Sequence, residues 1–406
     1  MRIIHTSDWH LGQYFFTKSR AAEHQHFLTW LVEQVKQYQV NAVIVAGDIF
    51  DTGSPPSYAR EIYNQFVVSL QQTGCQLVIL SGNHDSVSVL NETSSLLSYL
   101  NTTVITSGTE PHVITLQDEQ GQPGALLCAI PFLRPRDIQL SIAGQSSEEK
   151  QLSLQTAISD YYQASYQLAQ QQRELLNLDI PIIATGHLTV VGAELTDSVR
   201  DIYIGTLDAF PSGAFPPADY IALGHIHRPQ VIGGKAHIRY CGSPIALSFD
   251  EANQEKSVCL VEFNGCQMTQ ISQLTIPTFQ RLLTLKGNLD QIKQQLHDHI
   301  PQSSEPLIWL DIEVASQDYL TDIQQRIENL VDNLPVEVVL LRRARKASQH
   351  QQAVTINESL NELTVEEVFL RRLTEETMED KDKEQRLVLL FKQSCDALRS
   401  ELEENA

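Results

Sequence analysis

The sequence lacks the paired cysteines that a disulfide framework or a zinc site would need. Its 406 residues contain six cysteines, and no two of them form a C-x-x-C pair. Several lie within apolar runs, so we expect buried free thiols in a reducing cytoplasm rather than disulfides or bound zinc. The six are Cys75, Cys128, Cys241, Cys259, Cys266 and Cys395.

Long apolar segments are also missing. No run approaches the roughly 20 apolar residues of a membrane-spanning helix. The chain enters the strand-like segment 2–6 directly, without the basic segment, apolar stretch and cleavage site of a secretory signal. We therefore expect a cytoplasmic protein that makes no membrane contact.

Positive charge is scarce. Lysine and arginine together number 29 against 50 acidic residues, which gives a formal net charge of -21. This balance argues against a protein that coats nucleic acid through its overall charge. It leaves DNA open as a substrate, because bound divalent cations can make a local site positive on an acidic protein.

The first 85 residues alternate apolar strand-like runs with helical patterns. Strands are expected at 1–7, 42–46 and 76–80, with a helix at 21–38 and another that begins at Pro55-Pro56. This order predicts βαβ units and a largely parallel inner sheet.

The rest of the chain is expected to complete this domain and to add two more, since 406 residues exceed one ordinary core. Expected loop, helix and strands of the first domain lie at 113–116, 125–131, 141–150 (loop), 154–176 (helix), 180–184, 220–223 and 258–263. A second unit alternates strand and helix at 282–285, 289–297, 307–314, 319–330 and 336–341. The predicted domains are 1–275, 276–345 and 346–406.

Side chains suited to metal binding follow the predicted strands at five points. They are Asp8, His10, Asp48, Asn83, His187, His225 and His227. In an open α/β sheet the ligand crevice lies at the carboxyl ends of the strands, so we expect these side chains to meet. Alternation along an extended segment is expected to put both members of each D-x-H or H-x-H pair on one side. A single histidine of this kind is more often a satisfied core residue, whereas the whole set predicts a metal centre.

The set contains only oxygen and imidazole donors. Seven donors are too many for one tetrahedral ion and suit two ions that share a carboxylate. The mixture favours Mn²⁺, Fe²⁺ or Zn²⁺ over Ca²⁺ or Mg²⁺. Two such ions polarise a phosphoryl group and activate water, so the residues predict a two-metal phosphoester hydrolase.

The loop 81–85 carries one imidazole more than the ions need. His84 can exchange a proton near neutral pH, which makes it the candidate proton donor to the leaving oxygen. Asp85 is expected to orient the ring of His84. Taken alone, the loop is explained about equally well as a polar turn with a satisfied histidine.

Five segments resemble the motifs of the calcineurin-like metallophosphoesterases. They are Asp8-x-His10, Gly47-Asp48-x-x-Asp51, Gly82-Asn83-His84-Asp85, Gly186-His187 and Gly224-His225-x-His227. Longer runs resemble the SbcD branch of that superfamily, the nuclease subunits of bacterial SbcCD complexes. Those runs are 7–12, 47–52, 198–205, 241–244, 336–343 and 364–369. The resemblance implies an α/β fold: a four-layer αββα sandwich, then a small α+β capping domain and a C-terminal helical tail.

The resemblance also implies roles for the site residues. One Mn²⁺ would be held by Asp8, His10, Asp48 and His227, and the other by Asp48, Asn83, His187 and His225. His84 would serve the leaving 3′ oxygen and Asp85 would orient it. Asp51 stands where some relatives carry a histidine, and it is left outside the expected catalytic set.

Activity and partners follow from the same resemblance. It implies a double-strand 3′–5′ exonuclease and a single-strand or hairpin endonuclease in DNA repair, recombination and replication at the nucleoid. The implied partner is SbcC, an SMC-like coiled-coil ATPase, in a heterotetramer built on a homodimer of the nuclease subunit.

Two segments near the C-terminus allow more than one interpretation. The basic run 342–346 would contact phosphate or form an exposed linker. An apolar stripe in the tail would pack against its own domain or dock onto a partner helix, and the resemblance favours SbcC. The stripe comprises Leu387, Leu390, Phe391, Leu398 and Leu402.

Two rival functions share this fold. Phosphatases of the superfamily typically carry an arginine soon after the second motif aspartate and Asn-His-Glu in the third motif, whereas this chain has Thr52-Gly53 and Asp85. A non-catalytic scaffold would have lost ligands, and here every ligand is present.

Overall fold

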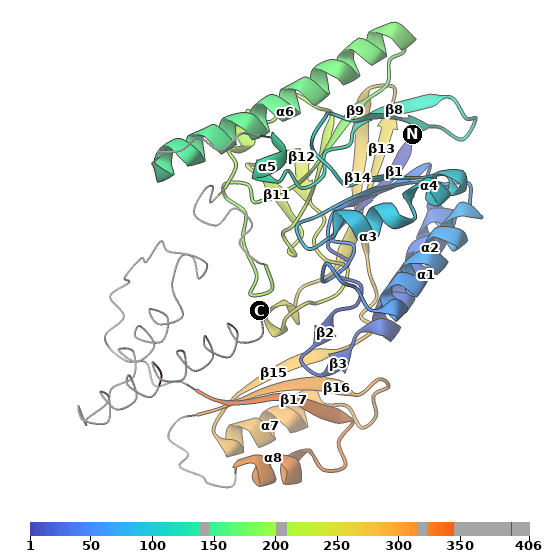
Figure 1. Ribbon diagram of the computed structural model, residues 1–406. Coiled ribbons are helices and arrows are strands. Elements are labelled where there is room, and N and C mark those ends of the chain that lie inside the picture. The colour runs from blue at the N-terminus through green and yellow to red at the C-terminus, as the bar shows by residue number, and fades with distance from the viewer. Residues whose placement is uncertain (139–145, 200–208, 316–322, 345–390, 392–406) are drawn as a thin grey trace, which may run out of the picture. The chain divides into compact units, whose positions relative to one another are not determined.

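The computed structural model of the chain describes residues 1–138, 146–199, 209–315, 323–344 and 391 (Figure 1). The chain divides into two compact units, 1–347 and 348–406. The tail expected to bind a partner lies outside the described residues, apart from position 391. None of the described helices is long and apolar enough to cross a membrane.

The first sheet contains six strands in the order β14-β13-β1-β4-β5-β6. Their bounds are β1 (Arg2–Thr6), β4 (Ala42–Ala46), β5 (Gln76–Leu80), β6 (Thr102–Ile105), β13 (Ser257–Asn264) and β14 (Gln267–Thr275). The four strands from β1 to β6 are parallel, as the βαβ pattern predicts, and β13 and β14 are antiparallel additions. Helices α1 (Ala21–Tyr38) and α2 (Ser57–Gln71) cover one face with an apolar cluster that includes Phe27, Leu31 and Phe66.

The second sheet also contains six strands, in the order β11-β12-β10-β9-β8-β7. Their bounds are β7 (Val113–Gln117), β8 (Pro123–Cys128), β9 (Ile182–His187), β10 (Tyr220–Gly224), β11 (Gln230–Ile232) and β12 (Lys235–Tyr240). The four inner strands are parallel and both edge strands are antiparallel. The long helix α6 (Ser147–Leu176) packs on this sheet through Leu154, Ile158 and Tyr162 (Figure 1).

The two sheets pack face to face through a third apolar cluster. It joins Ile44 and Val78 of the first sheet to Leu127 and Ile183 of the second, all at most 1% exposed. The order is therefore helices, sheet, sheet, helix, and the predicted α/β class is confirmed. Short elements complete this part of the chain: β2 (Tyr14–Phe15), β3 (Lys18–Ser19), α3 (Val87–Glu92), α4 (Ser94–Leu97), α5 (Pro135–Ile138), η1 (Ser98–Leu100), η2 (Ser212–Ala214) and η3 (Phe249–Glu251).

A separate three-stranded parallel sheet follows, in the order β15-β16-β17. Its elements are β15 (Leu282–Gly287), α7 (Leu289–His299), β16 (Ile308–Val314), α8 (Ile323–Val331) and β17 (Val336–Arg343). It has its own apolar cluster and also contacts the β2–β3 hairpin. Phe15 stacks on Trp309 with ring centroids 5.8 Å apart, and Lys18 pairs with Glu337.

Some local expectations were wrong. Residues 147–150, expected in a loop, begin α6, because Ser146 and Glu149 form a capping box. Strands β11, β12 and β14 were missed, because their mostly exposed sequences give a weak alternating pattern. Arg342 belongs to β17 rather than to a linker, and it donates to Asp311 at 2.7 Å; positions 345 and 346 lie outside the described residues.

The described cysteines follow the expectation closely. Cys75, Cys128, Cys241 and Cys259 are buried free thiols, and Cys266 is half-buried and free. Cys395 lies outside the described residues.

Candidate metal centre

The predicted donors lie where the carboxyl ends of the two sheets meet. Backbone hydrogen bonds join the loops after β1 and β4: the N–H of Asp8 donates to Gly47 at 3.0 Å. Other bonds cross between the sheets. The backbone N–H of His225 donates to the Asp8 carboxylate at 2.8 Å, and Nδ1 of His187 donates to the carbonyl of Ala46 at 2.9 Å. The ends of parallel strands therefore meet, as expected for an α/β crevice.

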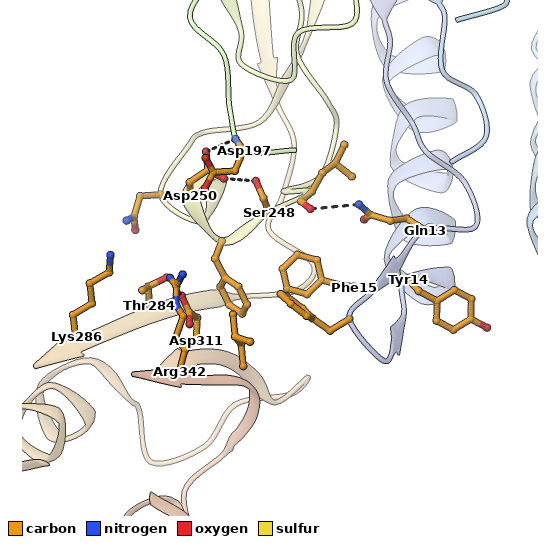
Figure 2. A pocket seen from close by; sticks show the side chains of 15 residues that line it. Gln13, Tyr14, Phe15, Asp197, Ser248, Asp250, Thr284, Lys286, Asp311 and Arg342 are labelled. Carbon is orange, nitrogen blue, oxygen red and sulfur yellow. Dashed lines mark hydrogen bonds and ion pairs between the residues drawn. The ribbon is translucent and has the colours of Figure 1, made fainter. Parts of the chain in front are cut away.

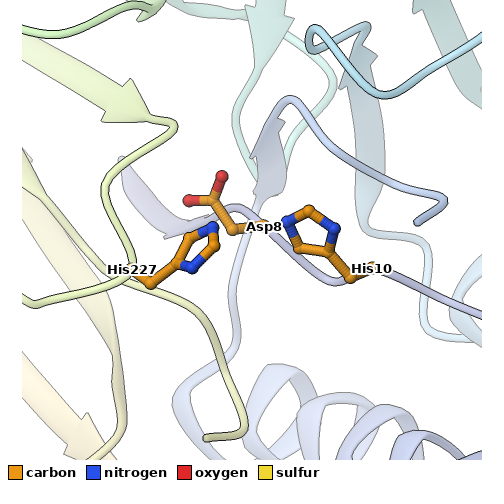
Figure 3. Close-up of side chains that lie close together, drawn as sticks. All are labelled: Asp8, His10 and His227. Atoms are coloured by element: carbon orange, nitrogen blue, oxygen red, sulfur yellow. The ribbon is translucent and has the colours of Figure 1, made fainter. Parts of the chain in front are cut away.

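One group of donors comprises Asp8, His10 and His227 (Figure 3). Each offers one ligand atom, and these atoms all lie within 4.8 Å of one another. All three side chains are buried, and in Figure 3 the two rings flank the Asp8 carboxylate. The distance between their positions in the sequence is bridged entirely by the packing of the two sheets.

A second group comprises Asp48, His187 and His225, again with ligand atoms within 4.8 Å of one another. Nε2 of His187 lies 3.2 Å from Oδ2 of Asp48 and 2.9 Å from Oδ1 of Asn83. All the expected metal-ligand side chains except the half-buried Asn83 are buried.

Asp48 connects the two groups. Its Oδ2 lies 3.6 Å from Nε2 of His10, a member of the first group, as well as 3.2 Å from His187. A third group of neighbouring ligand atoms unites His10, Asp48 and His84. The structure thus brings the predicted donors together, with one carboxylate between the two triads.

The electrostatics of the centre are those of a site with unsatisfied donors. Burial would raise the pKa of Asp48, but His187 and the neighbouring imidazoles hold it well below its usual range. Burial lowers the pKa of His225 well below its usual range. Nε2 of His10 and Nε2 of His225 are buried without a hydrogen-bond partner. Such atoms are costly unless something binds them, and the oxygen and imidazole set fits divalent metal ions.

Three glycines let the loops approach this closely. A Cβ at Gly82 would lie 2.1 Å from Oδ1 of Asp48, and one at Gly47 would lie 2.2 Å from Nδ1 of His187. At Gly224 it would lie 1.9 Å from the carbonyl oxygen of Ala46. No side chain fits at these positions, which explains a glycine directly before each of three motif residues.

The backbone of the ligand pairs is not extended. Asp8, His10, Asp48 and His225 have φ values of 54°, 48°, 53° and 93°. The alternation argument for the D-x-H and H-x-H pairs was therefore wrong for these segments. Non-glycine residues in this region are strained, and here the hydrogen bonds between loops hold them in place.

The contacts of Asp85 differ from the expected one. Its carboxylate accepts from the backbone N–H groups of Ile49, Phe50 and Gly82. Burial and the nearby Asp48 carboxylate raise its pKa to about 6. Asp85 thus stabilises the loop after β4 instead of orienting the ring of His84.

Asp51 was left out of the expected set, yet it contacts two site histidines. Its carbonyl oxygen accepts from Nδ1 of His84 at 2.7 Å, and its carboxylate lies 3.2 Å from Nδ1 of His10. The G-D-x-x-D spacing of the second motif was the available sequence signal.

Comparisons with known proteins agree on one family. Residues 1–229 match the family described as calcineurin-like phosphoesterase, and residues 278–377 match the type 5 capsule protein repressor C-terminal domain. The chain is 56% identical to the SbcD subunit of the nuclease SbcCD from Escherichia coli (strain K12), over 99% of this chain and 100% of that protein. Identity to the protein of the same name from Rhodobacter capsulatus is 30% over 91% of this chain and 93% of the relative. The Bacillus subtilis protein of that name is 31% identical over 79% of this chain and 81% of its own length.

Replacing Gly82 by alanine should displace Asp48 and weaken divalent-ion binding by at least about tenfold. The added Cβ would lie 2.1 Å from Oδ1 and 2.4 Å from the backbone nitrogen of Asp48. Gly53→Ala is the matched control, because its nearest contact would be 3.7 Å from Ser86. Calorimetric titration with Mn²⁺ measures both variants. Equal affinities for the two would contradict the crowding argument.

Ion binding should release a proton from His187. Burial lowers the pKa of this imidazole, but the Asp48 carboxylate raises it to about 9, so the metal-free protein holds this proton at neutral pH. A metal ion needs the unprotonated nitrogen, so the affinity should rise with pH by up to about tenfold per unit and level off near pH 9. Calorimetry in buffers of different ionisation enthalpy counts the released protons. Proton release that does not diminish above about pH 9 would contradict the assignment.

Proposed function

Because this chain belongs to the SbcD family of calcineurin-like phosphoesterases and is a metal-dependent nuclease, we propose that it cuts DNA phosphodiester bonds with two Mn²⁺ ions. The proposed activities are a double-strand 3′–5′ exonuclease and a single-strand or hairpin endonuclease, used in DNA repair, recombination and replication. One observation carries the proposal: Asp48 lies between two groups of buried donors, as two ions that share a carboxylate require.

The donors divide between the ions by their grouping. Asp8, His10, Asp48 and His227 would hold one ion, and Asp48, Asn83, His187 and His225 would hold the other. When bound, the ions would polarise the scissile phosphoryl group and lower the pKa of the attacking water. The mixed oxygen and imidazole donors favour Mn²⁺ over the harder Mg²⁺ and Ca²⁺.

His84 is the proposed acid for the leaving 3′ oxygen. It is half-buried, whereas the imidazoles of the four expected ligands are buried, so it is the histidine of the centre that substrate can reach. Nδ1 donates to the carbonyl of Asp51, which fixes the ring. Proton transfer to the departing oxygen would therefore take place at Nε2. Asp85 supports this geometry indirectly, through the backbone of Ile49 and Phe50.

The proposed domains are a nuclease domain at 1–275, a capping domain at 276–345 and a partner-binding tail at 346–406. A cavity of about 570 Å³ supports the capping role (Figure 2). It is lined by the β2–β3 hairpin, the segment 247–253 and the sheet that contains Lys286 and Arg342. Gln13 also lines it and donates its backbone N–H to the ligand residue His10, so the cavity begins next to the metal centre. We propose that DNA passes between the hairpin and this sheet.

The proposed partner is SbcC, an SMC-like coiled-coil ATPase, bound through the tail. Support comes from the relatives, whose names make them one subunit of the SbcCD nuclease, and from the apolar stripe in the tail sequence. We propose a homodimer of this chain within a heterotetramer. Its DNA substrate would place the complex at the nucleoid, in the cytoplasm.

The His84→Gln variant should bind Mn²⁺ normally and cleave DNA about 10²- to 10⁴-fold more slowly, because glutamine keeps a polar side chain but cannot donate a proton as an acid. The assay measures Mn²⁺-dependent cleavage of blunt duplex and hairpin DNA, with and without SbcC and ATP. The exposed His26 of α1, changed to glutamine, is the control.

Normal cleavage by His84→Gln would remove this residue from the mechanism. The same assay separates the rival functions. Turnover of a phosphoprotein but of no DNA would indicate a phosphatase, and Mn²⁺ binding without turnover of any phosphodiester would indicate a scaffold.

Truncation after Ala347, the boundary between the two compact units, should abolish SbcC binding and leave Mn²⁺ binding unchanged. Co-purification with SbcC measures the first effect, and calorimetry measures the second. In the full chain, Leu390→Asp should act like the truncation, because it places a charge in the apolar stripe. Gln385→Asp, on the opposite face of a helix in this register, is the control. SbcC capture by the truncated chain would refute the tail assignment.

A further inference from the structure

A buried carboxylate lies behind one of the proposed ligands and belongs to none of the five motifs. Glu251, in the short helix η3, is 0% exposed. Its Oε1 lies 3.6 Å from Nδ1 of His227. Metal-binding histidines commonly use their second nitrogen to bond a carboxylate, which sets the tautomer and the ring orientation. The position of Glu251 matches that arrangement.

A serine hydroxyl completes the contact. Oγ of Ser198 lies 2.5 Å from Nδ1 of His227, and it also bonds Oε1 of Glu251. A hydroxyl has one proton, and an ionised carboxylate can only accept, so Ser198 donates to Glu251. It must then accept from Nδ1–H of His227. This order leaves the lone pair on Nε2 of His227, the nitrogen available to a metal ion beside Asp8 and His10.

A buried lysine holds the other side of the carboxylate. Nζ of Lys256 donates to Oε2 of Glu251 at 2.6 Å and to the backbone carbonyl of His227 at 3.1 Å. Lys256 is 8% exposed, so the ion pair is shielded from water. Removing one partner of such a pair would leave a buried charge without compensation, and the remaining one keeps its place only while both are present.

Two sequence runs that resembled the SbcD branch converge on this pair. Ser198 opens the run 198–205, and Ser243 lies in the run 241–244. The backbone N–H of Ser243 donates to the carbonyl of His227 at 3.1 Å, and its hydroxyl accepts from Lys256 at 3.0 Å. The metal-ligand motifs gave no role to either serine. Both are now accounted for by contacts to one ligand residue.

We propose that Ser198, Ser243, Glu251 and Lys256 form a positioning unit that holds the ring and backbone of His227 for the ion on the Asp8 side of the centre. This inference rests on the proposed function, since it requires that the centre bind metal. The unit touches neither Asp48 nor His187 in any described contact. Its loss should therefore weaken one ion and spare the other.

The test counts Mn²⁺ ions on the full-length, metal-free protein by electron paramagnetic resonance and calorimetry. Two ions are expected for the unaltered chain. In Ser198→Ala the affinity for one ion should fall about 10- to 100-fold while the other ion binds as before. Glu251→Gln should have the same selective effect. Ser198→Thr keeps the hydroxyl and should restore the affinity.

Asp250→Asn is the matched control, because Asp250 is the exposed neighbour of Glu251 and bonds the backbone of Asp197 rather than His227. Unfolding curves of the metal-free variants report on folding, and Ser198→Ala decides the test if Glu251→Gln does not fold. Two ions bound to Ser198→Ala with unaltered affinity would overturn the inference. Equal weakening of both ions would also overturn it. An unaltered chain that binds no Mn²⁺ would instead overturn the proposed function, and the positioning role with it.

Discussion

The centre depends on one buried carboxylate. Asp48 is 1% exposed, and its Oδ2 lies within 3.2 Å of His187 and 3.6 Å of His10, two residues from different sheets. A buried charge of this kind is tolerated only when it is paired, hydrogen-bonded or bound to metal. Its other oxygen accepts from the backbone N–H of His84, which places the catalytic candidate beside the ligands. Imidazoles, loop backbone and catalytic histidine are thus arranged around the same side chain.

The two packed sheets supply the rigidity that this arrangement needs. Their apolar faces are almost completely buried, and each delivers its loops at the same edge. Only glycine fits where the loops cross, since a Cβ at Gly224 would lie 1.9 Å from the carbonyl oxygen of Ala46. The strained φ values of Asp8 and Asp48 are held by hydrogen bonds between neighbouring loops. A regular scaffold therefore carries an irregular site, and the strain is confined to the residues that face the centre.

The periodicity of the sequence was informative where burial is complete on both faces of a strand. The run 42–46 was predicted with its observed bounds for this reason, and so was 76–80. Half-exposed edge strands such as β14 gave no comparable signal, because polar and apolar residues alternate only weakly there. Ligand types were readable too, since seven oxygen and imidazole donors after apolar runs are difficult to explain as packing. The partners of Asp85, Asp51 and Glu251 were not readable.

The sequence by itself determined the donor chemistry and the strands that carry it, because residue type and local period depend on neighbours in the chain. Only the tertiary structure decided which donors meet. The backbone N–H of His225 reaches a carboxylate 217 positions away, and His187 reaches a carbonyl 141 positions away. Such distances are set by how two sheets pack and by where loops cross. No local pattern encodes those contacts, which is why Glu251 came to light behind His227 only in the folded chain.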